Sequence, residues 1–437
     1  MGENRDQLNK RRRARRAQQK ARARRRRMAL RLLAAVMVLG VSAAAIWLLV
    51  RTFSDGDGPT EPSSESVSQT RPAEVQTEDS ADTTVIHLAA AGDIMVTDKT
   101  VKAGKSGKTY DYTDVFMDVL PVLAGADLTV ANFEGNLLGK PYGTETTSAP
   151  VQMAEALKDA GVDLVQMANS TVISDGIAGL KTSLAALRET GLEPLGAYAD
   201  SQEYEKYKGY TIVDVQGIRI AFAAFTKGMG GLSLPAGSED CVNLLYTDYA
   251  TTYKEIDKDG IAEVLANVAK EKPDLTIALV HWGSEYMDQV TDGQKKIAKI
   301  MKENGADVVL GTHSHLLHEI EYDELTGQMV AYSLGDLFGD GERAGTDYSV
   351  ILDLEITRDN NSGDTKVTNY SYTPIYILTK NTAPDGQHRV VQLDKAVDAY
   401  EDNFVDRVSE DVYNDMTHAL SRIPERINPP KEEEEKK

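Results

Sequence analysis

The chain has 437 residues, enough for two or three domains or for one large α/β domain with extensions. Its net charge of −20 combines a basic start with an acidic remainder: residues 1–27 carry +11, Arg31 adds one more positive charge, and residues 51–437 carry −32. This acidic balance opposes simple electrostatic capture of a polyanion, and the single cysteine, Cys241, excludes an intramolecular disulfide.

A long apolar run follows the basic start and predicts a transmembrane anchor at residues 28–50. The nineteen residues 32–50 are uncharged and would span roughly 28 Å as a helix, close to the ~30 Å thickness of the hydrocarbon layer. A cleaved signal peptide is the alternative, but the run exceeds the ~7 to 15 apolar residues of a signal core. The positive-inside rule then makes residues 1–27 a basic cytoplasmic arm, which needs no nucleic-acid partner to explain it. We predict a single-pass protein of the cell membrane with its main domain outside the cytoplasm.

The rest of the chain divides by composition. Residues 51–83 are rich in Ser, Thr, Glu, Asp, Pro and Gly and show no apolar period, so they are predicted to be a flexible stalk. The main domain is predicted at 84–380. Residues 381–437 form a C-terminal extension that ends in an acidic tail.

Strands and helices are predicted to alternate through the main domain, which favours an α/β fold with buried strands. Strands are expected at 85–91, 128–131, 163–168, 218–225, 275–280 and 308–310, and helices at 112–123, 153–160, 177–190, 261–270 and 293–304. After residue 310 the pattern changes to hairpins, which pair 319–322 with 329–333 and turn a strand at 349–356 back across 359–363. The sheet is therefore expected to be mixed.

Four of the seven histidines lie between residues 281 and 318. His313 and His315 form a His-x-His pair immediately after a predicted strand, and His281 follows the strand before it. Neutral imidazole is the commonest protein ligand for zinc, copper, nickel and iron, and carboxylates can complete such a shell. Taken alone, the His-x-His pair could also be two surface histidines on a loop.

Other polar residues occupy the same kind of position. Asp93, Glu134 and Asn169 each follow a predicted strand, as the histidines do. Open α/β sheets bring such positions together at the carboxyl ends of their strands. Asp93 or Glu134 alone could be a helix cap or a turn residue. Together with three histidines they predict one cleft that binds a divalent metal ion, whose identity the sequence leaves open.

At this point the motifs resemble those of a known family. Residues 84–378 are similar to the CapA family of capsule-synthesis or poly-gamma-glutamate-synthesis proteins, which are related to calcineurin-like metallophosphatases. The resemblance is carried by Gly92-Asp93-Ile94-Met95, Asn132-Phe133-Glu134-Gly135-Asn136, His281-Trp282-Gly283-Ser284-Glu285-Tyr286, the run from Gly305 to His315, and Tyr332-Ser333-Leu334-Gly335-Asp336.

The resemblance implies a metallophosphatase-like α/β/β/α sandwich and a membrane anchor. It also implies a role in making or exporting poly-gamma-glutamate or another envelope polymer, together with other membrane synthesis proteins. Metal-ligand roles transfer by position to Asp93, Glu134, His281, His313 and His315, with Glu285 as a candidate catalytic group for proton transfer.

One loop departs from the family pattern. Where the family usually has Ala-Asn-Asn-His, this chain has Ala168-Asn169-Ser170-Thr171. In metallophosphatases the replaced pair supplies a bridging metal ligand and the acid that protonates the leaving group. Asn169 could shift by one residue to bind metal, which the sequence leaves open. A second departure puts Asp336 where the family usually has an asparagine.

Three functions therefore stay open. The first is an accessory protein of poly-gamma-glutamate or capsule assembly, and the second is a metal-dependent phosphoesterase or amide hydrolase that acts on an envelope substrate. The third is a non-catalytic binding module with a degraded metal site. Because Thr171 replaces an imidazole, any phosphoesterase activity is expected to be weak or absent.

Overall fold

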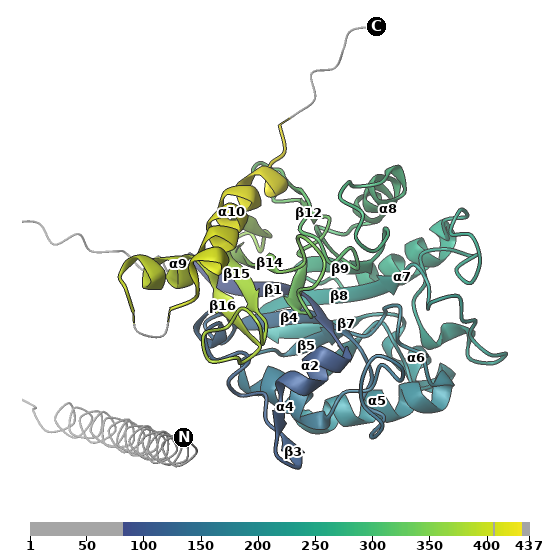
Figure 1. Cartoon of the computed structure of the whole chain (residues 1–437). Helices are drawn as coiled ribbons and strands as arrows, with labels where there is room; N and C mark the ends of the chain where they lie inside the picture. The colour runs from purple at the N-terminus through teal and green to yellow at the C-terminus, as the bar shows by residue number, and fades with distance from the viewer. Residues whose placement is uncertain (1–81, 405–406, 431–437) are drawn as a thin grey trace, which may run out of the picture. The chain divides into compact units, whose positions relative to one another are not determined.

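The computed structural model describes residues 82–404 and 407–430 (Figure 1). The predicted cytoplasmic arm at 1–27, the anchor at 28–50 and the stalk up to residue 81 lie outside the described residues, as does the end of the acidic tail. Within the described part, no helix is both long enough and apolar enough to cross a membrane.

Two mixed β-sheets form the framework. The first has the strand order β16-β15-β14-β1-β4-β5-β6, with β13 paired to β1, and the second has the order β11-β12-β10-β9-β8-β7. The first sheet contains β1 (Thr83–Met95), β4 (Leu128–Glu134), β5 (Leu164–Gln166), β6 (Glu193–Leu195), β13 (Asp336–Phe338), β14 (Tyr348–Asp359), β15 (Thr365–Leu378) and β16 (Arg389–Gln392). The second contains β7 (Thr211–Val215), β8 (Ile218–Thr226), β9 (Leu275–His281), β10 (Val308–Thr312), β11 (Ile320–Tyr322) and β12 (Met329–Ala331). A small separate ribbon pairs β2 (Lys105–Ser106) with β3 (Thr109–Tyr110).

Both faces of the second sheet are buried. Successive residues of β10 point to opposite faces, so Val309 packs in a core with Ile297 and Met301 of α8 (Asp292–Glu303). Val308 and Leu310 instead join the large core that the second sheet shares with the first. This period of two explains why the strands appear as continuous apolar runs in the sequence.

Helices cover the outer faces of the two sheets. The helices α7 (Lys258–Lys270) and α8 pack on the second sheet, whereas α4 (Val151–Asp159) and α5 (Gly176–Thr190) lie on the far side of the first (Figure 1). The remaining helical segments are α2 (Asp98–Ala103), α3 (Leu120–Leu123), α6 (Ser201–Tyr207), η1 (Glu239–Cys241), α9 (Leu393–Glu401) and α10 (Glu410–Ile427). The predicted α/β class with mixed sheets is confirmed.

The predicted helix at 112–123 is wrong, because only α3 is helical there. Pro121 lies in the first turn of α3, where its missing N–H costs nothing, but a longer helix would place it in the interior. The preceding residues form turns that bury Tyr112 and Phe116. Both predicted hairpins are confirmed, since β11 pairs with β12 and β14 with β15 in antiparallel fashion.

The C-terminal part packs on the main domain. The strand β16 extends the first sheet by pairing with β15, and α10 buries Met416, Ile423 and Ile427 in the same large core. Arg426 of α10 contacts loops next to the candidate site described below.

Parallel pairing brings the carboxyl ends of strands from each sheet to one edge. In the first sheet Asp93 of β1 is in register with Asn132 of β4, and also with Asp336 of β13. In the second sheet His281 at the end of β9 is in register with Thr312 of β10. This edge carries the polar residues that the sequence singles out.

Candidate metal centre

The structure brings five predicted site residues together. Their donor atoms form overlapping groups, within which all atoms lie within 4.8 Å of one another. One group joins Asp93, Glu134 and His281, and another joins Glu134, His313 and His315. All five side chains are buried. Glu134 belongs to both groups, so it would be shared if two ions were bound.

The local backbone has an unusual shape at this point. His313 and His315, in the loop after β10, have φ angles of 92° and 60°, in the region that favours glycine. Gly92 allows β13 to approach β1, because a Cβ there would lie 1.8 Å from the Gly335 carbonyl oxygen. Such strain clusters at functional sites, and here it aims both imidazoles at the carboxylates of the first sheet.

The carboxylates and imidazoles of the ligands approach one another at distances longer than a hydrogen bond. Glu134 Oε1 lies 3.6 Å from His281 Nε2, and Glu134 Oε2 lies 3.8 Å from His315 Nε2. Asp93 Oδ2 lies 3.6 Å from His315 Nδ1. These separations exceed hydrogen-bond length, but they suit donors that surround a cation with bonds of about 2.0 to 2.2 Å.

Unpaired donor atoms provide a direct test of whether a metal fits. Glu134 Oε2, His281 Nε2 and His313 Nδ1 are buried and have no hydrogen-bond partner among the described residues. Leaving such atoms unpaired costs about 1 to 3 kcal/mol each, or more for charged groups. Divalent cations held by the two donor groups would satisfy these atoms, so the residues fit a metal of the kind that nitrogen and carboxylate ligands bind.

Burial shifts the protonation of these ligands. It raises the pKa of Glu134 to about 7 and that of Asp93 to about 6. Burial also lowers the pKa of His281 and of His313 well below the usual value. Both histidines are therefore neutral near pH 7 and offer lone pairs, whereas burial outweighs the charge of His315, which lowers the pKa of both carboxylates.

Polar neighbours orient the ligands. The amide of Asn132 donates to Asp93 Oδ1 at 2.5 Å, and the backbone N–H of His313 donates to Asp93 Oδ2 at 3.0 Å. Thr312 Oγ1 lies 3.2 Å from His281 Nδ1, so the other ring nitrogen of His281 faces Glu134. Such partners fix the ring orientation and the tautomer of a ligating histidine.

The sequence reasoning gave Asp336 no role. This buried carboxylate lies 2.8 Å from His315 Nδ1, and with Asp93 and His315 it forms a third potential donor group. Burial alone would lower the pKa of His315, but Asp336 and the other carboxylates hold it well above its usual value. The only signal in the sequence was the exchange of the family's asparagine for aspartate.

The loop at 169–171, which differs from the family pattern, forms hydrogen bonds with residues of the site. Asn169 donates to the Phe133 carbonyl oxygen at 2.7 Å and to Asn132 Oδ1 at 3.2 Å, and its own Oδ1 accepts from the Thr171 hydroxyl at 2.9 Å. The Ser170 hydroxyl donates to Glu134 Oε1. In this arrangement Asn169 holds Asn132 in place, and its assignment as a metal ligand stays a prediction.

Glu285 lies on the solvent side of the cluster. Its side chain is exposed, and its charge is one of the causes that raise the pKa of Glu134, after burial and the charge of Asp93. It belongs to none of the three donor groups. A role in proton transfer stays a prediction.

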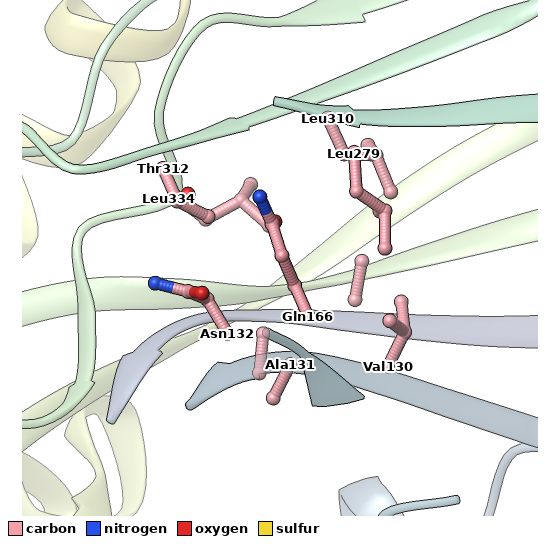
Figure 2. Close-up of a pocket in the computed structure, with 10 residues that line it drawn as sticks. Val130, Ala131, Asn132, Gln166, Leu279, Leu310, Thr312 and Leu334 are labelled. Atoms are coloured by element: carbon pink, nitrogen blue, oxygen red, sulfur yellow. The ribbon is translucent and has the colours of Figure 1, made fainter. Parts of the chain in front are cut away.

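The floor of the site is apolar. A cavity of about 10 Å³ lies between the sheets, close to the volume of one water probe. Figure 2 shows Asn132, Gln166 and Thr312 beside Val130, Leu279 and Leu310 around it. Since Asn132 and Thr312 also contact the ligands, the cavity adjoins the site, where burial of the carboxylates raises their pKa values.

Comparisons with known proteins agree with the motifs. Residues 87–340, more than half of the chain, match the model of the bacterial capsule synthesis protein PGA_cap. The chain therefore belongs to this family, and the predicted resemblance to CapA proteins is confirmed.

Individual relatives are more distant. The chain is 28% identical over 280 residues to the capsule biosynthesis protein CapA of Bacillus anthracis, an alignment that covers 62% of this chain and 64% of that protein. It is 28% identical over 306 residues to the PGA biosynthesis protein CapA of Bacillus subtilis (strain 168). This alignment covers 69% of this chain and 74% of that protein.

Two solved structures are also similar. A novel phosphatase from Mycoplasma pneumoniae has a TM-score of 0.39 and 14% identity over 67% of this chain and 94% of its own. A putative 5'-nucleotidase from Staphylococcus aureus has a TM-score of 0.41 and 10% identity, over 77% of this chain and 58% of its own.

Proposed function

We propose that the protein takes part in the synthesis or export of poly-gamma-glutamate or a related capsule polymer at the cell surface. We further propose that residues 28–50 anchor it in the membrane, with the described domain outside the cytoplasm, where it works with other membrane proteins of the synthesis machinery. The observation that carries the proposal is the buried donor set of Asp93, Glu134 and three histidines within the family match, in which Glu134 Oε2, His281 Nε2 and His313 Nδ1 have no hydrogen-bond partner among the described residues.

The centre is proposed to hold one or two divalent cations. Asp93, Glu134 and His281 would hold one ion, and Glu134, His313 and His315 would hold the other. A bound divalent ion supplies Lewis-acid polarisation of an oxygen and lowers the pKa of coordinated water. The chain itself positions the ligands through Asn132 and Asp336, and it buries all five ligand side chains.

A metal-dependent hydrolase is the second candidate. Two donor groups that share one carboxylate suit a two-metal site, which favours this reading. Against it stands the loop at 169–171, where Thr171 offers a hydroxyl that already donates to Asn169. No imidazole is present at this position to protonate a leaving group near neutral pH. Hydrolysis of unactivated alkyl phosphates is therefore expected to be slow.

A non-catalytic binding module is the third candidate, and the metal content of the purified protein separates it from the other two. The wild type should retain a divalent metal through gel filtration, whereas His281→Ala should lose it. His418→Ala is the matched control, because His418 is an exposed histidine of α10 outside the donor groups. A wild-type protein that binds no divalent metal would favour the degraded-site reading.

The role in polymer synthesis is tested in cells. Deletion of the gene should reduce the surface polymer, measured as acid-released glutamate. A wild-type copy or His418→Ala should restore the polymer, whereas Asp93→Ala should not. Normal polymer in the deletion strain would refute the proposal.

Membrane topology is tested separately. Protease added to intact cells should remove the described domain but leave an epitope within residues 1–20 protected. A mature protein that begins near residue 45 would instead indicate a cleaved signal peptide.

A further inference from the structure

Lys227 shares the structural position of the metal ligands. It directly follows β8, whose last residue, Thr226, is in register with His281 of β9. The backbone N–H of Lys227 donates to the His281 carbonyl oxygen at 2.8 Å. Lys227 is therefore another polar residue at the carboxyl edge of the second sheet, and the site described above gives it no role.

The ammonium group of Lys227 has few partners. Its Nζ donates to the Gly283 carbonyl oxygen at 2.6 Å and lies 4.9 Å from the centre of the Tyr253 ring. Within the described part of the chain, no carboxylate oxygen lies within 4.0 Å of it. An ammonium has three N–H donors, so this half-buried group keeps donors for a further oxygen atom.

The hydrogen bonds of Lys227 to the carbonyl oxygens of His281 and Gly283 place its charge near the metal ligands. After burial, the positive charge of Lys227 is the main cause that lowers the pKa of His313. The charges of Glu285 and Glu134 act on Lys227 in turn. A cation so close to a cation site weakens metal binding by repulsion. If Lys227 served only to hold the Gly283 carbonyl, a neutral donor would serve better.

A second positive charge flanks the same cluster. The Arg343 guanidinium lies 3.9 Å from the centre of the Tyr286 ring, and that ring lies 5.2 Å from the ring of His315. Arg343 is exposed. Two cations beside a buried metal centre stand out in a region that carries −32 over residues 51–437. Local attraction of an anion at this site would oppose the repulsion of the domain as a whole.

We propose that Lys227 binds an oxyanion of the substrate next to the metal centre, with Arg343 at the outer side of the same subsite. The bound group is a carboxylate if the substrate is a γ-glutamyl chain and a phosphate if it is a phosphoester. The inference rests on the proposed function only for the identity of the polymer. It makes Lys227 a residue that selects charged over neutral substrates.

The test compares Lys227→Gln with the wild type in the full chain, purified in detergent with the metal it carries. Glutamine keeps an N–H donor for Gly283 and removes the charge. Lys299→Gln is the matched control, because Lys299 is an exposed lysine of α8 that pairs with Glu303. Lys227→Arg keeps the charge, so it distinguishes the loss of charge from a folding defect caused by substitution at this position. Calorimetry would measure the binding of γ-linked triglutamate, of a neutral analogue that is N-acetylated and has a carboxamide in place of every carboxylate, and of inorganic phosphate.

Lys227→Gln should weaken the binding of triglutamate and phosphate by about 10- to 100-fold, as expected for a lost charge-assisted hydrogen bond. It should leave the neutral analogue and the metal content unchanged. Lys227→Arg and Lys299→Gln should stay within a few-fold of the wild type.

Each other outcome refutes one of the two proposals. If the wild type binds triglutamate and Lys227→Gln binds it equally well, the subsite is wrong and the proposed function stands. If the wild type binds only phosphate, and does so through Lys227, the subsite stands and the polymer assignment fails. If neither anion binds, the subsite is wrong, and the polymer level of the deletion strain decides the proposed function separately.

Discussion

The metal ligands and the loop at 169–171 beside them leave their polar groups in different states. On the second-sheet side, His281 Nε2 and His313 Nδ1 are buried and have no hydrogen-bond partner among the described residues. Glu134 Oε2 of the first sheet is unpaired as well, but the loop at 169–171 on that side satisfies its own groups, since Thr171 donates to Asn169 and Ser170 donates to Glu134 Oε1. Unpaired buried donors indicate where a cation would lie, whereas a closed hydrogen-bond network indicates structural support. The comparison suggests that metal binding and general acid catalysis can be lost separately.

The largest expected effect comes from restoring the first-sheet loop. The double substitution Ser170→Asn with Thr171→His should raise the turnover of an alkyl phosphate by about 10²- to 10⁴-fold, because an imidazole can protonate the leaving group near pH 7. Turnover of an activated aryl phosphate should rise less, since its leaving group needs little protonation. Steady-state kinetics on both esters measure the difference.

The control for this prediction is the same double variant with Asp93→Ala, which should be inactive. Rapid turnover of an alkyl phosphate by the wild type, abolished by Asp93→Ala, would show that the loop had not lost the acid function. The hydrolase reading would then take first place.

Protons should compete with the metal mainly for the two carboxylates of the first sheet. Their pKa values are about 7 for Glu134 and about 6 for Asp93, so both gain protons as the pH falls from 8 to 5.5. A protonated carboxylate is a poor ligand, and the raised pKa of His315 acts in the same direction. Metal affinity should therefore fall by about 100-fold over this range. Titration with a chelator-buffered metal at each pH measures it, and a pH-independent affinity would contradict the arrangement.

Substitutions of Asp336 test how much its contact with His315 contributes to metal binding. Asp336→Ala removes the acceptor at 2.8 Å from His315 Nδ1 and should weaken metal binding by about 10- to 100-fold. Asp336→Asn keeps an acceptor oxygen and restores the family's residue, so it should lose less. Equal losses in both variants would mean that the charge of Asp336 matters more than its hydrogen bond, as for a direct ligand.

The long strands and the shared edge could be predicted from the sequence because they depend on local patterns. Apolar runs predict the buried strands, and the polar residues near the end of each run predict the edge, where the donor atoms of Asp93, Glu134 and His281 meet in the structure. Asp336 lies in the three-residue strand β13, which is too short for a periodic signal. Its position depends on the close approach of Gly92 and Gly335, a tertiary contact. The hydrogen bonds of Asn169 likewise depend on residues distant in sequence.

The smallest expected effect concerns how the second-sheet loops are held. Arg426 of α10 pairs with Asp288 and donates to the Leu317 carbonyl oxygen and the Tyr348 hydroxyl. It thereby joins the C-terminal helix to the loops that follow His281 and His315, whereas the first-sheet loop at 169–171 is held by its own contacts.

Arg426→Met should therefore lower the free energy of unfolding by about 1 to 3 kcal/mol, because the carbonyl and hydroxyl partners lose a charged donor. The matched control is Arg422→Met, one turn earlier in α10, whose partner Glu425 is exposed; it should cost less than about 0.5 kcal/mol. Denaturant unfolding of the metal-free protein measures both variants. Since Arg426 contacts neither the ligands nor their hydrogen-bond partners, metal affinity should change only a few-fold. A loss as large as that of Asp336→Ala would show that α10 determines the geometry of the second-sheet ligands rather than only the stability of their loops.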